Sequence, residues 1–262
     1  MYKNNIKPRI LVIGATHGHE YLGVLVLKEL KKLQISEEIL QFEIGNLQAY
    51  RKGVTFIDSD LNRVFPGDKK GDYEQRRAYE LSQKIRQVDI VIDIHATNTI
   101  SMIADAMLIV TKLNPQTEEL IQIINPPRLL VMRYGSDRAV ISNAKIGIAF
   151  EYGDNDNKKA FESILFSIGE ILCTYKIIKK NPYSSSLTKA KTKSYEVYDT
   201  YKKPCRKKCV LVKKVKNYKM INKGDCIARC GNETICADET FIPILFGENR
   251  YKEILGFRSR RI

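Results

Sequence analysis

The sequence predicts an α/β fold, in which a mixed, largely parallel sheet flanked by helices is followed by a small β-rich C-terminal domain. Short apolar runs alternate with amphipathic segments up to about residue 180, which is typical of layered α/β proteins. From Tyr195 onward, short runs containing valine, isoleucine and tyrosine are separated by turn sequences, which is typical of β-structure. We expect a catalytic domain over residues 1–185 and the β-rich domain over residues 190–262.

The elements of the first domain follow from the spacing of its apolar residues. Apolar or almost wholly apolar runs predict buried strands at residues 10–13, 89–94, 107–110, 129–132 and 146–150. Apolar residues that recur every three or four positions predict helices at residues 21–33, 73–86 and 161–177. The polar, proline-containing stretch at residues 181–186 predicts a loop before the second domain.

Length, charge and hydropathy exclude some classes of protein. A chain of 262 residues can bury a sizeable core, and its apolar runs are too short to span a membrane, so we expect a cytoplasmic protein without a membrane partner. The net charge is +14, with lysine and arginine concentrated in residues 202–216. That region lacks an aromatic-rich RNA motif, so we do not expect nucleic acid as the main partner, whereas small carboxylate substrates suit a basic surface. The sequence leaves the oligomeric state open.

Two of the three histidines lie at the carboxyl ends of predicted strands. His17 and Glu20 lie in the turn after the first strand, and His95 follows the strand at residues 89–94. At the opening turn of a helix, His17 and Glu20 would project to the same side. The carboxyl ends of parallel strands meet at the edge where α/β proteins bind ligands, so the three side chains are expected together. Three nitrogen or oxygen ligands leave a fourth position of zinc open to water, which indicates a hydrolase. The alternative is a glutamate at the start of a helix and two histidines with ordinary hydrogen-bond partners.

Further polar side chains are expected at the same edge. The stretch at residues 56–67 contains Asp60, which could orient a liganding histidine, and Arg63, whose planar guanidinium suits a carboxylate. An ordinary polar loop with local ion pairs is the alternative. Glu151 ends the apolar run at residues 146–150, so the strand would deliver its carboxylate to this edge.

The segments Gly14–Glu20, Asp60–Arg63 and Asp93–His95, in this order and at these separations, resemble the aspartoacylase and succinylglutamate desuccinylase family. These are zinc enzymes with the fold of the pancreatic carboxypeptidases. The resemblance implies that one zinc ion is bound by His17, Glu20 and His95. It also implies that Asn62 and Arg63 hold a substrate carboxylate, that Glu151 is the general base, and that Tyr251 closes over the substrate.

The sequence departs from the family at one position. The family usually has an arginine eight residues before Arg63, where it helps to stabilise the oxyanion of the tetrahedral intermediate, and here that residue is Thr55. Losing one such donor commonly lowers the rate about a hundred- to a thousandfold. Arg51 and Arg138 are the candidate replacements.

Five of the six cysteines lie in the C-terminal region. Cys205 and Cys209 are separated by three residues, as are Cys226 and Cys230, and Cys236 follows. Two such pairs of thiolates would suit a closed structural zinc site. The alternative is that these cysteines are small buried apolar residues that stay reduced in the cytosol.

We therefore predict a zinc-dependent hydrolase that cleaves the amide bond of a small N-acyl amino acid. Two alternatives are a carboxypeptidase-like peptidase and a weakly active relative that binds an anionic macromolecule through its basic tail. A further positively charged hydrogen-bond donor near the metal, in place of Thr55, would favour the hydrolase over the weakly active relative.

Overall fold

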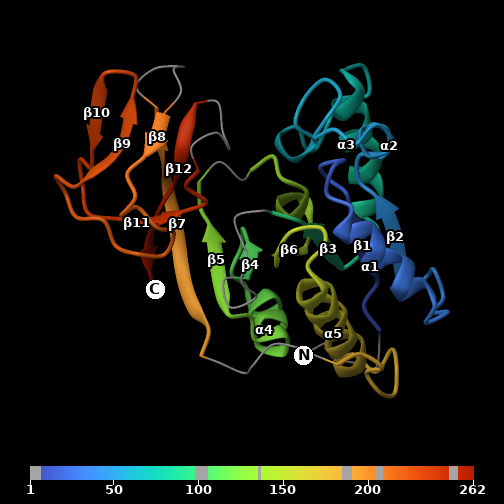
Figure 1. Ribbon diagram of the computed structural model, residues 1–262. Helices are drawn as coiled ribbons and strands as arrows, with labels where there is room; N and C mark the ends of the chain where they lie inside the picture. Colours follow the sequence, from blue (N-terminus) through green and yellow to red (C-terminus); the bar gives the residue numbers. More distant parts are fainter. Residues whose placement is uncertain (1–6, 98–105, 135–136, 185–190, 204–208, 248–252) are drawn as a thin grey trace. The chain divides into compact units, whose positions relative to one another are not determined.

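A computed structural model describes residues 7–97, 106–134, 137–184, 191–203, 209–247 and 253–262 (Figure 1). The chain forms two compact units, the first made of residues 1–130 and 136–193, and the second of residues 131–135 and 194–262. No helix in the described part of the chain is long and apolar enough to cross a membrane.

The first unit contains a mixed, largely parallel sheet, as predicted. Its strands are β1 (Ile10–Gly14), β2 (Leu40–Ile44), β3 (Ile90–His95), β4 (Met107–Val110), β5 (Arg128–Met132) and β6 (Ile146–Glu151), in the order β5-β4-β6-β3-β1-β2. The pairs β1–β2, β1–β3 and β3–β6 are parallel, whereas β4 runs antiparallel to β6. Strands β1 and β3 are buried along their whole length, which is why their sequences are almost wholly apolar.

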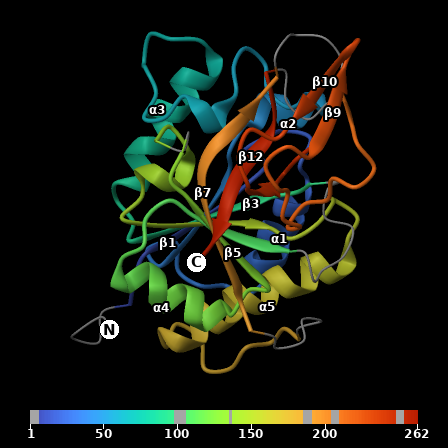
Figure 2. The ribbon, with the colours of Figure 1, turned by 90° about the vertical axis from the view of Figure 1, so that its left-hand side faces the viewer.

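Helices cover both faces of this sheet. They are α1 (Leu22–Lys31), α2 (Leu47–Lys52), α3 (Tyr73–Ile85), α4 (Pro115–Ile124) and α5 (Lys158–Thr174), with 3-10 turns η1 (Leu61–Arg63) and η3 (Val140–Asn143). Helix α5 contacts α1 and α4, while α3 contacts η1 and η3 on the opposite side of the sheet (Figure 2). On that second side, Leu11, Ile13 and Val91 of the sheet form a buried cluster with apolar residues of α3.

Two glycines allow helices to pack against the turn after β1. A Cβ atom on Gly14 would lie 2.6 Å from the carbonyl carbon of Gly23 in α1, and one on Gly18 would lie 2.1 Å from that of Ala49 in α2. Both distances are too short for a side chain, so only glycine permits the approach. The turn between β1 and α1 is thereby held against two helices.

The second unit is rich in β-structure, as predicted. Its strands are β7 (Lys193–Lys202), β8 (Cys209–Leu211), β9 (Cys226–Cys230), β10 (Glu233–Cys236), β11 (Ile242–Ile244) and β12 (Ile254–Arg261). Strand β12 pairs antiparallel with β7 and β11, and β9 pairs antiparallel with β8 and β10. The core contains Tyr201, Phe241 and Phe246 with their rings in contact, and the guanidinium of Arg258 lies 4.4 Å from the ring centre of Tyr201.

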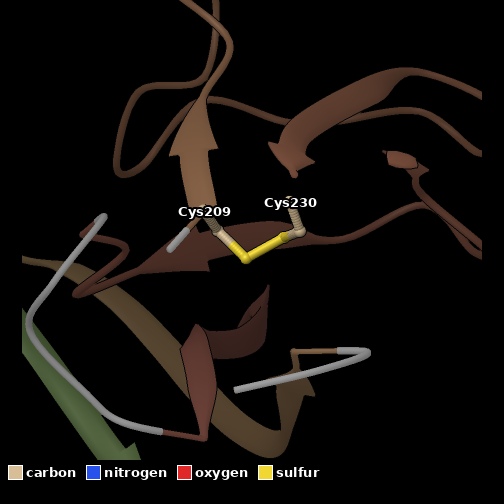
Figure 3. Close-up of a disulfide and its surroundings, with 2 residues drawn as sticks. All are labelled: Cys209 and Cys230. Atoms are coloured by element: carbon tan, nitrogen blue, oxygen red, sulfur yellow. A yellow bond between two sulfur atoms is a disulfide. The ribbon is translucent and has the colours of Figure 1, made fainter. Parts of the chain in front are cut away.

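The cysteines pair across strands, which corrects both interpretations of their spacing, as zinc ligands and as reduced residues. The strand register places Cys209 opposite Cys230, and these buried residues form a disulfide with a Cα–Cα distance of 4.1 Å (Figure 3). They are therefore neither reduced nor available as zinc ligands. Cys226 lies beside Cys236, with 3.3 Å between their Sγ atoms, and Cys205 is outside the described residues.

Candidate metal centre

The three predicted metal ligands lie together at the carboxyl ends of β1 and β3. One ligand atom from each of His17, Glu20 and His95 lies within 4.8 Å of the other two. Nδ1 of His17 is 3.0 Å from Oε1 of Glu20, and Nδ1 of His95 is 2.9 Å from Oε2 of the same carboxylate. Two imidazole nitrogens and a carboxylate therefore face one another, which is a ligand set suited to a divalent cation such as zinc.

The Nε2 atom of each imidazole, which lies on the far side of the ring from Glu20, is held by a further carboxylate. Nε2 of His95 lies 2.9 Å from Oδ2 of Asp93, and Nε2 of His17 lies 3.2 Å from Oδ1 of Asp60. A carboxylate in this position fixes the tautomer and orientation of a metal-binding imidazole, leaving the other nitrogen to the metal. Asp60 was predicted for this role, and Asp93 was missed. Its signal in the sequence is its place two residues before His95, which puts both side chains on one face of β3.

The Asp93 carboxylate is itself held in place. The hydroxyl of Thr16 donates a hydrogen bond of 2.7 Å to its Oδ1 atom, and both residues are buried. A buried carboxylate needs such partners because water cannot reach it. Thr16, Asp93 and His95 thus form a continuous chain of hydrogen bonds from the turn after β1 to the candidate metal centre.

The charges of the cluster shift the pKa values of its groups strongly. Burial of His17 acts to lower its pKa, but the Glu20 charge and the hydrogen bond with Asp60 raise it to about 9. Burial also opposes a charge on His95, yet Asp93 and Glu20 hold its pKa well above the ordinary value. Burial of Glu20 acts to raise its pKa, and the two imidazoles lower it far below the usual range. Three carboxylates around two rings make an environment that favours positive charge, as a metal cation requires.

A tight turn, and not the first turn of α1, brings His17 and Glu20 together. The amide of Glu20 donates to the carbonyl of His17 at 3.0 Å, and α1 begins only at Leu22. The expectation that both ligands lie on the opening turn of the helix was therefore wrong. The hydrogen bond between Glu20 and His17 closes a separate turn before the helix, and Tyr21, the residue before Leu22, provides no side-chain cap for α1.

The loop after β6 supplies the missing cap. Oδ1 of Asn155 accepts a hydrogen bond from the amide of Leu22 at 3.1 Å, and Nδ2 of Asn155 donates to the carbonyl of His19 at 2.9 Å. The hydroxyl of Tyr21 donates to the carboxylate of Asp156 at 2.7 Å. A segment about 135 residues away in the sequence therefore fixes the turn that carries two of the ligands.

The segment from Asp60 to Arg63 forms the short turn η1 beside η3. Oδ1 of Asn62 accepts from the amide of Val140 at 2.9 Å, and the carbonyl of Arg138 accepts from the amide of Phe65 at 3.2 Å. The guanidinium of Arg63 is exposed and donates to the carbonyl of Asn62. These bonds bring the backbone of Arg138 to the segment that carries Asn62 and Arg63.

A buried glutamate supports this segment from α3. The Glu74 carboxylate accepts three backbone hydrogen bonds of 2.7, 2.9 and 3.1 Å and one of 2.9 Å from Nδ2 of Asn46. The backbone donors are the amides of Ile57, Asp58 and Ser59. The sequence did not reveal this role, because an acidic residue in the first turn of a helix is common on protein surfaces.

Glu151 lies at the end of β6, and Thr55 lies beside the turn that carries His17. Glu151 ends β6 and is paired in register with His95, so both side chains emerge on the same face of the sheet. The carbonyl of Thr55 accepts from the amide of Gly18 at 3.1 Å, so this residue lies against the ligand turn with an exposed, neutral side chain. Arg51 is exposed near the end of α2. Tyr251 is outside the described residues.

Solved structures share this fold over almost the whole chain. Murine aminoacylase 3 superposes with a TM-score of 0.76 and 18% identity, covering 98% of this chain and 96% of that one. A succinylglutamate desuccinylase/aspartoacylase from Rhodobacter sphaeroides gives a TM-score of 0.71 and 16% identity, covering 98% of this chain and 86% of that one. At such identities the likeness establishes the fold class, that of the aminoacylases and desuccinylases.

The sequence then establishes the family. Residues 6–159 match the model of the succinylglutamate desuccinylase/aspartoacylase catalytic domain, and the chain belongs to this family. A probable aspartoacylase from Prochlorococcus marinus is 35% identical over 103 residues, covering 34% of each protein. An N-acyl-aromatic-L-amino acid amidohydrolase from Xenopus tropicalis is 33% identical over 109 residues, covering 35% of this chain and 34% of that protein. The matched region thus spans about a third of the length of these relatives.

Proposed function

We propose that the protein is a zinc-dependent hydrolase that cleaves the amide bond of a small N-acyl amino acid. The observation that carries this proposal is the convergence of two imidazole Nδ1 atoms on one carboxylate, with the outer nitrogen of each ring held by a further carboxylate. The family, together with the amidohydrolase activity named for the Xenopus relative, supports the amide as the scissile bond.

His17, Glu20 and His95 would hold the zinc ion. When bound, zinc supplies a Lewis acid that polarises the substrate carbonyl and lowers the pKa of water. Two imidazoles and one carboxylate are a ligand set of catalytic zinc sites, which keep one position open. Asp60 and Asp93 keep the two rings oriented.

Glu151 would transfer the proton. In the reaction, a bond forms between the water oxygen and the carbonyl carbon, and the bond from that carbon to nitrogen breaks. A carboxylate beside His95 can accept the proton of the attacking water and deliver it to the departing nitrogen. The strand register and the burial of Glu151 support this role.

The substrate carboxylate would be bound by Asn62 and Arg63, on the segment that Glu74 supports. Arg138 is our proposed replacement for the family arginine at Thr55, because its backbone is bonded next to this segment. Tyr251 remains the predicted residue that closes over the substrate. We further propose that residues 1–185 are the catalytic domain and residues 190–262 the accompanying β-rich domain, and that the enzyme is cytoplasmic.

The function is tested by metal analysis and a substrate screen on the full chain. We expect about one zinc ion per chain, lost in His95→Ala because one of three ligands is removed. The matched control is His19→Ala, which alters an exposed histidine of the same turn outside the cluster and should keep its zinc. The purified protein should release carboxylate from N-acyl amino acids.

The outcomes of this screen separate the alternatives. Unchanged zinc content in His95→Ala would exclude the proposed ligand set. Cleavage of short peptides without cleavage of acyl amino acids would identify a carboxypeptidase-like enzyme. Bound zinc without any hydrolysis would favour the weakly active relative that binds an anionic macromolecule through its basic tail.

Substrate choice should depend on Arg63. We expect the wild-type protein to prefer an N-acyl amino acid over its carboxamide analogue by at least about tenfold in kcat/KM, which corresponds to about 1.4 kcal/mol. Arg63→Ala should remove this preference, because the charge of the substrate loses its bidentate partner. Lys69→Ala, which changes another exposed cation in the following loop, should keep it. Equal rates of the wild-type protein on acid and carboxamide would disprove the carboxylate contact.

A further inference from the structure

The β9–β10 hairpin of the second unit carries two thiols in contact. Cys226 begins β9 and Cys236 ends β10, and the two residues are partners in the strand register. Their Sγ atoms are 3.3 Å apart. A disulfide bond is about 2.05 Å long, so the sulfur atoms need to approach by only about 1.3 Å.

The neighbouring strand pair provides a comparison within the same sheet. Cys209 and Cys230 are also partners across antiparallel strands, and they are already joined by a disulfide. That disulfide is buried, whereas Cys226 and Cys236 are exposed. Because thiol–disulfide exchange requires a thiolate to reach a sulfur atom, exposure decides which of the two pairs can react.

We propose that Cys226 and Cys236 form a second, reversible disulfide by exchange with low-molecular-weight disulfides and thiols such as oxidised and reduced glutathione. Neither the comparisons nor the proposed hydrolysis involves these residues. The inference therefore does not depend on the proposed function.

The exchange runs in two steps, and either thiol can begin it, because either sulfur can be the donor in the contact between them. The thiolate of one cysteine attacks a sulfur of the glutathione disulfide and releases one glutathione. The thiolate of the other cysteine, whose Sγ atom lies 3.3 Å away, then attacks the cysteine sulfur of this mixed disulfide and releases the second glutathione. Two electrons and two protons pass from the cysteines to the glutathione disulfide.

The new bond would fix an edge strand. Strand β10 lies at the end of the order β10-β9-β8, so among the described strands it pairs with β9 alone. A strand with one neighbour opens more easily than a central strand. The bridge would join the open ends of the two strands and should slow amide hydrogen exchange in Glu233–Cys236.

The experiment uses the full chain equilibrated in glutathione buffers, from fully reduced to fully oxidised. Free thiols are alkylated in the native state, and the peptides are identified by mass spectrometry. We expect the link between Cys226 and Cys236 to rise from absent to complete across the series, while Cys209 and Cys230 stay linked throughout. Full alkylation of Cys226 and Cys236 in every buffer, or their pairing with other cysteines, would overturn the proposal.

Single variants test the second step. Cys236→Ser should accumulate glutathione on Cys226, and Cys226→Ser should accumulate it on Cys236, because neither variant has the second thiol that releases it. Cys173→Ser, which removes a cysteine of the first unit, should respond to the buffers as the wild-type protein does. Absence of the adduct from both single variants would overturn the proposed exchange, whereas the link in the wild-type protein tests the pair independently of any variant.

Discussion

Replacing Glu151 with glutamine is expected to leave zinc bound and to reduce the rate of amide hydrolysis by about 100- to 10,000-fold. Glutamine has nearly the same volume and can occupy the same place at the end of β6, in register with His95. Its amide cannot accept a proton from water at neutral pH, so the variant would lack proton transfer while the three metal ligands stay intact. The measurement is kcat on an N-acyl amino acid together with zinc content.

A matched control separates proton transfer from a general change of charge. Glu118→Gln alters an exposed carboxylate on α4 and should leave kcat unchanged. Near-normal turnover in Glu151→Gln would remove this residue from the mechanism. Loss of zinc together with activity would instead assign Glu151 to the stability of the metal centre.

Replacing Glu74 with alanine is expected to lower the free energy of unfolding of the first unit by about 3–5 kcal/mol. The buried carboxylate accepts three backbone hydrogen bonds and one from Asn46, and alanine would leave all four donors without this partner. The affected loop leads directly into Asp60, so hydrolysis should fall as well. The measurement is urea-induced unfolding monitored by circular dichroism.

The control for this prediction lies on the same helix. Glu80→Ala removes an exposed carboxylate whose ion pair with Arg77 is 3.1 Å long, and such surface pairs contribute about 0–1 kcal/mol. A loss below about 1 kcal/mol in Glu74→Ala would show that water replaces the carboxylate fully. In that case Glu74 would not be the support of the Asp60 segment.

The grouping of His17, Glu20 and His95 could be predicted because these residues lie at or just after the ends of apolar runs. The apolar run before His95 identifies a buried parallel strand, and such strands deliver their last side chain to one edge of the sheet. His17 and Glu20 follow the first apolar run in the same way. The fold class was predictable for the same reason, since strands buried on both faces are continuously apolar.

The supporting residues could not be predicted, because their partners lie far away in the sequence. Glu74 bonds to residues about 16 positions earlier, and Asn155 bonds to His19 across 136 positions. Hydrophobic periodicity reports the environment of a residue and carries no information about its partner. The edge strand β2 was missed because it is half-buried and lacks a continuous apolar run.

The cysteines show the same limit in another form. Two pairs separated by three residues suggested the ligands of one structural zinc site, but in this β-rich unit the strand register decides which sulfur atoms meet. Cys209 and Cys230 are 21 positions apart and are direct neighbours across β8 and β9. Spacing along the chain is therefore a poor guide to proximity once the segments are strands.

The two hydrogen bonds of Asn155 bear on how this site can change in evolution. They tie the turn of His17 and Glu20 to the loop that follows the strand of Glu151. A shift of that loop would carry the turn with it, since α1 has no cap of its own to keep the turn in place. Insertions between β6 and α5 would therefore disturb the proposed metal binding and the proposed proton transfer together, and natural variation in substrate preference should accumulate in other loops of the fold.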